Sequence, residues 1–359
     1  MVTDFASAGF RNVRIRINLE KPTLNTTFMT KLRNQVNLSL ENEISPILAY
    51  QGFLLEESTQ THEQNKIHLA EWWENMTDAF QGYSYNLSFN ILIEISGRYK
   101  DDYTNMNDFY AEVYRRVRDK DANRILIFPP VHLSDPDDLQ YLVIPGGATE
   151  KYVAAEWHFY AAGPNPDTSS KKYWINGSTA AERSGVLEPI QTAVSWSQSK
   201  GYSTWVGAWM AGNYNKGNNY NIVEQVRFGS FMAQSLEDAN IPWSINADNK
   251  FYNFENHTWF LTSDTAGIAV RDAILSPRSA CLYSGINYAG DCIKLTEGTY
   301  SRTDLNGRGF VGVQSLMVPF GYYAILTSEA MGMIVQNIYY STTSTIPVSQ
   351  ITSVQVVKS

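Results

Sequence analysis

The sequence predicts an α/β fold: a (β/α)8 barrel, the TIM-barrel architecture, followed by a smaller all-β module. Residues 1–276 alternate short β-branched runs with longer amphipathic segments, as repeated βα units around a parallel sheet do. Residues 277–359 carry short alternating runs broken by Gly and no long helical period. Hydrophobic residues form 43% of the 359 residues, which is enough for a large buried core.

Each element is predicted from its local pattern. The strand-like runs are residues 12–17, 46–51, 89–95, 124–128, 152–160, 204–210 and 242–247. Between and after them, helical periodicity predicts helices over 28–40, 67–80, 107–119, 186–199, 223–237 and 267–275. A (β/α)8 barrel needs eight strands, and the chain opens with the helix-like run MVTDFASAGF. We therefore expect the first barrel strand to be absent from this sequence.

The charge balance excludes several classes of protein. The formal net charge is −8 and the pI is about 5.2, so no basic stripe exists to bind a nucleic acid. No run approaches 18 uninterrupted apolar residues, so we expect no membrane span. The aromatic content of 13% is high for an ordinary core and suits stacking against sugar rings.

Glycosylation sequons indicate secretion. The Asn-x-Ser/Thr motif occurs at Asn25, Asn37, Asn75, Asn86, Asn176 and Asn256. That number is about twice the chance expectation of ~3 in so Asn-rich a chain. We expect an extracellular glycoprotein, with chance occurrence as the alternative.

The order of the strand-end motifs carries a family resemblance. GFRNVRIRI is followed by strands that end in Glu, then by EWHFY and by TWVGAWMAGNYN. This series resembles glycoside hydrolase family 5, the cellulase-like barrels with paired glutamates. The resemblance implies that Arg14 lies under the active site and that His158 and Tyr160 line it beside the nucleophile. It also implies a Trp243–Ser244 pair in the last strand, which in the family often has a cis peptide bond.

Two departures separate this chain from the family pattern. The family's acid/base Glu is expected four residues beyond Glu94, where this chain has Gly97-Arg98. The family's nucleophile is expected where this chain has Ala208. With both expected glutamates replaced, the family's double-displacement mechanism does not carry over.

Two other glutamates remain as candidate catalytic groups. Strand parity places Glu94 on one inward face, and Glu156 with His158 on another. Paired carboxyl groups are what glycoside hydrolysis requires, so Glu94 and Glu156 are the predicted acid and base or nucleophile. His158, Tyr160 and Arg14 would set their charge states. The alternative is structural: Glu94 is the buried partner of Arg14, and Glu156 lies too deep to touch substrate.

Candidate substrate-binding residues follow the carboxyl ends of the strands, where barrel enzymes collect their ligand contacts. Besides Arg14 and Tyr160, they are Gln51, Trp209, Asn213, Trp243 and Asn246, with a loop or core role as the alternative. The His and Cys residues show no metal-ligand spacing, so no metal or other cofactor is expected.

The C-terminal module carries a second resemblance. CLYSGINYAGDCIKL, VGVQSLMVPFGYYAILT and ITSVQVV resemble the βγ-crystallin module, a sandwich of two Greek-key motifs. The resemblance rests on Tyr288 and Gly290 in a hairpin and on the Ser315-Leu316 and Ser353-Val354 steps. Residues 310–311 and 348–349 lack the oxygen pairs that Ca²⁺ requires. Cys281 and Cys292 bracket a short hairpin and would form a disulfide bond in an oxidising compartment, with two buried thiols as the alternative.

Two functional hypotheses follow. The first is a secreted, glycoside hydrolase-like protein acting on a β-linked polysaccharide of the cellulose, β-glucan or mannan class. The second is a catalytically inactive barrel that binds glycan, or an extracellular structural glycoprotein that self-associates through its C-terminal module.

Overall fold

The computed structural model describes residues 1–147, 150–160, 179–211, 221–246, 251–259, 267–347 and 350–359. The chain divides into two compact units, each described by itself. The first unit comprises Met1–Phe159, Glu188–Trp209 and Ile241–Ser244. The second unit comprises Tyr160–Leu187, Met210–Asn240 and Ile245–Ser359. No helix in the described part of the chain is long and apolar enough to cross a membrane.

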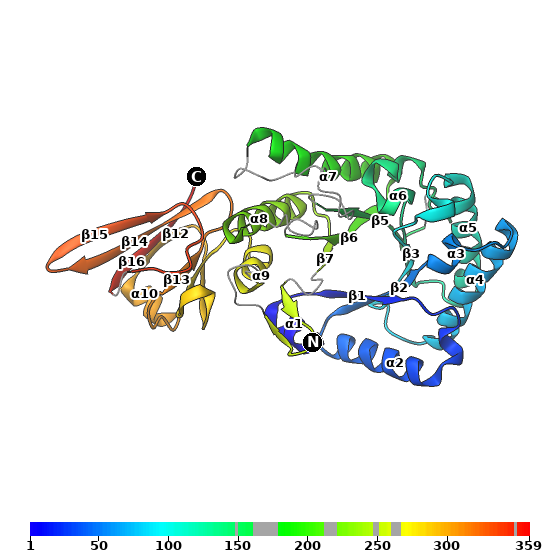
Figure 1. The fold of residues 1–359 in the computed structure, drawn as a ribbon, viewed down its shortest axis with the longest axis horizontal. Helices are drawn as coiled ribbons and strands as arrows, with labels where there is room; N and C mark the ends of the chain where they lie inside the picture. Colours follow the sequence, from blue (N-terminus) through cyan, green and yellow to red (C-terminus); the bar gives the residue numbers. More distant parts are fainter. Residues whose placement is uncertain (148–149, 161–178, 212–220, 247–250, 260–266, 348–349) are drawn as a thin grey trace. The chain divides into compact units, whose positions relative to one another are not determined.

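A seven-stranded sheet in the order β1 to β7 forms the centre of the first unit (Figure 1). Neighbouring strands from β1 to β6 pair in parallel. The strands are β1 (Asn12–Ile17), β2 (Ser45–Gln51), β3 (Ser88–Ile93), β4 (Ile125–Phe128), β5 (Val153–Phe159), β6 (Ser203–Trp209) and β7 (Trp243–Ile245). All seven predicted strands are therefore confirmed, with ends that differ by a few residues.

Side chains join the two edge strands of this sheet. The side-chain amide of Asn12 on β1 donates to the carbonyl oxygen of Trp243 on β7 at 3.0 Å, and Asn12 also accepts from the Ser244 hydroxyl. The sheet is thus a nearly closed barrel of seven strands, as predicted. The cis peptide bond that the family often has at this Trp–Ser step is absent here, because the described residues contain no cis peptide bond.

Helix α1 precedes β1, the other helices follow strands, and together they cover the outside of the first unit (Figure 1). They are α1 (Val2–Ala8), α2 (Thr26–Glu41), α3 (Phe53–Glu56), α4 (His62–Ala79), α5 (Tyr103–Lys120), α6 (Val131–Ser134) and α7 (Ala180–Lys200), whose last part belongs to this unit. Asn25 caps α2 by accepting from the Phe28 amide at 3.0 Å, and Thr61 and Gln64 form a capping box on α4. These caps lie a few residues before the apolar periodicity begins, so α2 and α4 both start earlier than predicted.

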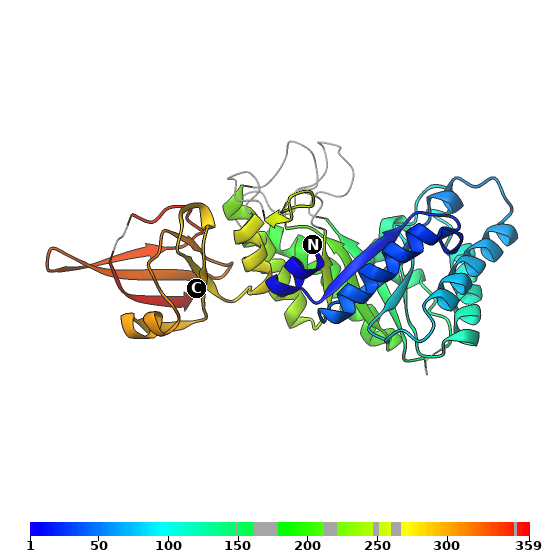
Figure 2. The same ribbon diagram turned by 90° about the horizontal axis from the view of Figure 1, so that it is seen from below.

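The second unit contains the all-β module (Figure 2). Its other elements are α8 (Ile222–Asp238), α9 (Gly267–Leu275) and a short hairpin of β8 (Tyr252–Asn253) and β9 (Thr258–Trp259). The module's strands are β10 (Ala280–Tyr283), β11 (Cys292–Leu295), β12 (Gly298–Ser301), β13 (Ser315–Met317), β14 (Tyr322–Ala330), β15 (Met333–Tyr339) and β16 (Ile351–Lys358), with α10 (Arg302–Gly307) between β12 and β13. The domain boundary predicted at residue 276 falls between α9 and β10.

The module's strands form two antiparallel sheets, in the orders β11-β10-β13 and β12-β16-β14-β15. Leu282 and Leu295 from the first sheet and Leu326 and Val354 from the second share one buried hydrophobic cluster. The arrangement fits the all-β prediction, while the Greek-key, crystallin-like assignment stays a prediction.

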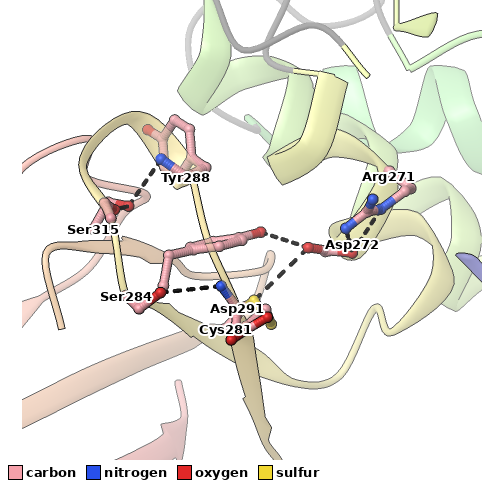
Figure 3. The surroundings of a disulfide bond; sticks show 10 residues. Arg271, Asp272, Cys281, Ser284, Tyr288, Asp291 and Ser315 are labelled. Atoms are coloured by element: carbon pink, nitrogen blue, oxygen red, sulfur yellow. Dashed lines mark hydrogen bonds and ion pairs between the residues drawn. A yellow bond between two sulfur atoms is a disulfide. The ribbon is translucent and has the colours of Figure 1, made fainter. Parts of the chain in front are cut away.

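The predicted disulfide bond is confirmed. Cys281 on β10 and Cys292 on β11 are bonded, with Cα atoms 5.6 Å apart. Beside the disulfide, Asp272 of α9 accepts from the Tyr283 hydroxyl at 2.8 Å and pairs with Arg271 (Figure 3). The disulfide therefore lies beside a buried hydrogen bond, from Tyr283 to Asp272, that joins α9 to the module's first sheet.

Candidate functional site

Polar side chains converge at the carboxyl ends of the three neighbouring barrel strands β1 to β3 and of β5. They are Arg14 and Arg16 on β1, Gln51 on β2, Asn90 and Glu94 on and just after β3, and Glu156 and His158 on β5. Group members on the same strand are two or four residues apart, so their side chains share the barrel's inner face. The predicted residues Arg14, Gln51, Glu94, Glu156 and His158 are thus brought together.

Glu156 is fully buried and has three polar partners. It forms a salt bridge with Arg14, accepts from Nε2 of His158 at 2.6 Å and accepts from Nδ2 of Asn90 at 2.6 Å. Burial alone would raise the pKa of this carboxyl, but the charges of Arg14 and His158 and the hydrogen bonds lower it. Glu156 is therefore a buried carboxylate whose oxygens are already occupied by protein groups.

His158 connects Glu156 to Glu94. Its Nδ1 lies 3.1 Å from Oε1 of Glu94, while Nε2 faces Glu156. Burial acts to lower the pKa of His158, but the charge of Glu156 and the hydrogen bonds to both glutamates raise it above the ordinary value. The raised pKa favours the imidazolium form, in which each ring nitrogen donates to one carboxylate, and Nη1 of Arg14 also lies 3.1 Å from Nε2.

Glu94 is the partly exposed member of the Glu94–His158–Glu156 chain. Its side chain is 22% exposed, and its Oε2 lies 3.8 Å from Nη2 of Arg16. Burial acts to raise the pKa of Glu94, but the hydrogen bond and charge of His158, with Arg16 and Arg14, lower it to about 2. Its backbone φ of 51° is left-handed, a conformation that costs a non-glycine residue about 1 kcal/mol. The residue directly after the end of β3 therefore combines a strained backbone with an ionised side-chain carboxylate.

A local irregularity in β6 accommodates Glu156. The β5–β6 register shifts so that Glu156 pairs with Trp205 and His158 pairs with Ala208, which leaves Gly207 as the extra residue. A Cβ atom on Gly207 would lie 1.9 Å from Oε1 of Glu156, so only glycine fits there. The register also places Ala208 on the same face as His158, at the position where the family resemblance predicts a nucleophile.

Arg98 lies away from this group. It belongs to the 3-10 turn Gly97–Tyr99, and its guanidinium donates to the carbonyl oxygens of Ser58 and Gln60. Glu94, and not Arg98, is the residue that follows the end of β3 directly. The placement of the family's acid/base position at Arg98 stays a prediction that the geometry does not favour.

The remaining predicted binding residues divide into three groups. Gln51 is buried and accepts from Nε of Arg16 at 3.1 Å. Trp209 is fully buried, as its core alternative predicts, and packs edge-on against the partly buried Trp243. In the second unit, Asn246 donates to the Tyr160 hydroxyl at 3.2 Å. Asn213 lies outside the described residues.

Three residues of the site were not predicted: Arg16, Asn90 and Gly207. Strand parity could have found the first two, since Arg16 follows Arg14 by two residues and Asn90 precedes Glu94 by four. Gly207 carried no such signal, because its role depends on the register shift between β5 and β6.

A pocket of about 260 Å³ lies in the loop that follows β1. It is lined by Glu20, Lys21, Pro22, Thr23 and Leu24 from this loop and by His68, Glu71, Trp72 and Asn75 from α4. Loops after the strands form the carboxyl-end face of a barrel, where ligands bind. This pocket is therefore a second place at that face where polar groups could contact a ligand.

A metal-ligating arrangement occurs once in the described part of the chain. Asp272, Cys281 and Cys292 have ligand atoms close together, but the two sulfur atoms are joined in the disulfide bond. The two cysteines of this group are therefore bonded to each other, and Asp272 is hydrogen-bonded beside them.

Comparisons with known proteins agree with the fold. Endoglucanase H of Acetivibrio thermocellus is 21% identical over 268 residues, which are 71% of this chain and 28% of that protein. This chain thus spans little more than a quarter of that relative.

Solved structures share the fold. The cellulose synthase subunit Z of Clostridioides difficile matches with a TM-score of 0.63 at 17% identity, over 76% of this chain and 90% of that one. Endoglucanase Cel5A of Thermotoga maritima matches with a TM-score of 0.61 at 18% identity, over 72% and 85%. A family model described as cellulase (glycosyl hydrolase family 5) matches residues 1–249. The chain therefore belongs to glycosyl hydrolase family 5, the cellulase family.

Proposed function

We propose that this chain binds a β-linked glucan at the carboxyl ends of its barrel strands and does not cleave it through Glu94 and Glu156. The supporting observation is the His158 ring, which is hydrogen-bonded to Glu94 on one side and to Glu156 on the other. In a glycosidase the two carboxyl groups flank the bond that is cleaved, roughly 5 to 9.5 Å apart. An imidazole that fills the space between them leaves no room there for a sugar.

The charge states support the same proposal. A general acid in glycoside hydrolysis needs a raised pKa, so that it holds a proton at the working pH. The pKa of Glu94 is instead lowered to about 2, and that of Glu156 is lowered as well. Neither carboxyl group holds a proton to donate near neutral pH.

The exposed groups of the site suit a neutral sugar polymer. Glu94 and Arg16 offer an acceptor and donors that can hydrogen-bond vicinal hydroxyl groups. Trp243 is only partly buried, and its indole would supply a ring for stacking on a sugar face. Membership of the cellulase family and the similarity to endoglucanases favour β-linked glucan as the polymer.

Binding and cleavage can be measured side by side. Isothermal titration with cellohexaose should give saturable binding to the full chain, weakened in Glu94→Ala and unchanged in the exposed control Glu329→Ala. Incubation with barley β-glucan and with carboxymethyl cellulose should release no reducing sugar. Absence of binding would contradict glucan recognition, whereas release that Glu94→Gln abolishes would contradict the non-cleaving assignment.

Hydrolysis is the second candidate function, and the position of Glu94 favours it. Strained backbone is commonly stored at functional sites, and catalytic residues of barrel enzymes lie at the carboxyl ends of strands. Glu94 would then act with a carboxyl group other than Glu156. The reducing-sugar assay above decides between the two candidates.

We also propose that the protein is secreted and glycosylated. The disulfide bond suits an oxidising compartment, and Asn25, Asn37, Asn75, Asn86 and Asn256 are all exposed. A mass shift on treatment of the native protein with an N-glycosidase would support glycosylation, and an unshifted mass would contradict it. Asn176 lies outside the described residues.

A further inference from the structure

The C-terminal module has an unprotected sheet edge. In the described residues β15 pairs only with β14, so β15 is the outer strand of the four-stranded sheet. An outer strand presents a row of backbone donors and acceptors to any extended segment beside it. Proteins usually protect such an edge with lysines, prolines or bulges.

The sequence of β15 contains none of them. The strand reads Met-Ile-Val-Gln-Asn-Ile-Tyr, and no Asp, Glu, Lys or Arg occurs between Glu329 and Lys358. The β14–β15 pairing runs from Ala324–Tyr339 to Ala330–Met333 without a register shift. Most of β15 is exposed to solvent, including Met333 and Ile334, which is 79% exposed. The edge is therefore long, regular and apolar.

We propose that β15 pairs with β15 of a second copy of this chain, in antiparallel orientation, to join two modules into one continuous sheet. Two copies of a chain with net charge −8 repel each other, so self-association requires a surface without charge. The uncharged stretch around β15 provides such a surface. A partner with basic or acidic residues would gain no ion pair there.

The order of residues in β15 is complementary to itself. Antiparallel pairing about a two-fold axis at Gln336 places Gln336 opposite its own copy and Ile334 opposite Ile338. Both isoleucines are exposed in the chain, at 79% and 49%. Each would then pack on the other across the new strand pair, and the two glutamine amides could hydrogen-bond to each other.

Light scattering on the full chain tests the proposal. The wild type should show twice the chain mass of 40.6 kDa and dissociate on dilution. Ile334→Lys should be monomeric, because it places two lysines at the paired edge. Val311→Lys is the matched control, since Val311 is 80% exposed in the same module but lies outside β15. Both variants should keep the wild-type circular dichroism spectrum.

Cross-linking tests the register. Gln336→Cys should form a disulfide-linked dimer on mild oxidation, because the two substituted positions face each other. Met333→Cys should not, because the two copies of that position would lie about 20 Å apart along the strands. A monomeric wild type at every concentration would overturn the proposal. A dimer that persists in Ile334→Lys, or cross-linking by Met333→Cys alone, would overturn it too.

Discussion

Nε2 of His158 lies 2.6 Å from Oε1 of Glu156, and both side chains are buried. Arg14 contacts the same carboxylate oxygen, so one buried anion balances two cationic groups. Charged groups are tolerated in a protein interior only when each has a partner. Glu156 is therefore chiefly a structural residue that holds Arg14 and His158 in place.

Replacement of Glu156 should destabilise the first unit strongly. Glu156→Gln leaves Arg14 and His158 without their buried counter-charge, which typically costs about 3–5 kcal/mol. Denaturant unfolding of the variant should show this loss in the free energy of unfolding. Glu94→Gln is the control, and its loss should be smaller because Glu94 is partly exposed. Equal losses in the two variants would contradict the structural role of Glu156.

Glu94 should make the stability depend on acidic pH. Its pKa is lowered from the ordinary 4.5 to about 2, so its ionised form is favoured in the folded state. The resulting stabilisation is fully present above pH 4.5 and is lost as the pH falls towards 2. The difference in unfolding free energy between wild type and Glu94→Gln should therefore shrink over that range. A difference independent of pH between 6 and 2 would contradict the lowered pKa.

Gly207 should tolerate no side chain. In Gly207→Ala the new methyl group would overlap the Glu156 carboxylate, whose displacement breaks its contacts with Arg14 and His158. We expect a loss of about 3 kcal/mol in the free energy of unfolding. Gly307→Ala is the control, because a Cβ there meets no atom within 4 Å and the residue ends a helix. A Gly207→Ala protein as stable as the control would contradict the described packing.

Sequence reasoning predicted the barrel well because each strand has its own local signal. The β-branched runs and the helical periodicities between them defined the seven strands, and parity placed Glu94, Glu156 and His158 on inner faces. The acidic partner of Arg14 was harder to predict from the sequence. The alternative with Glu94 as the partner of Arg14 is wrong, because Arg14 forms its salt bridge with Glu156. That choice depends on the relative height of residues on β1, β3 and β5, which a sequence does not contain.

Loss of the disulfide bond should weaken the C-terminal module. Cys281 and Cys292 are 11 residues apart in sequence, and closing a loop of that size stabilises a fold by about 3 kcal/mol. A reducing agent or the double substitution Cys281→Ser/Cys292→Ser should lower the melting temperature of the module. The double variant should not respond to the reductant. An identical melting temperature with and without reduction in the wild type would contradict this stabilisation.

Introducing a carboxyl group at residue 208 should create cleavage activity. Ala208 pairs with His158 in the β5–β6 register and faces the same side, so the side chain in Ala208→Glu would extend beside His158. Glu94 directly follows the end of β3 at the same carboxyl-end face of the barrel and would act as its partner. The added negative charge would also disfavour ionisation of Glu94 and raise its pKa towards the value that a general acid needs. We expect reducing-sugar release from β-glucan by Ala208→Glu and none by Ala208→Gln, which adds a side chain of the same size without the charge.

The double variant Ala208→Glu/Glu94→Gln completes this test. It keeps the introduced carboxyl group but removes the acid, so it should release no sugar from the unactivated polymer. Cellohexaose binding by all three variants would show that the barrel is folded and the glucan site is intact. If Ala208→Glu binds glucan yet releases nothing, the position of residue 208 relative to the sugar is wrong. If the double variant is as active as Ala208→Glu, Glu94 is not the acid at this site.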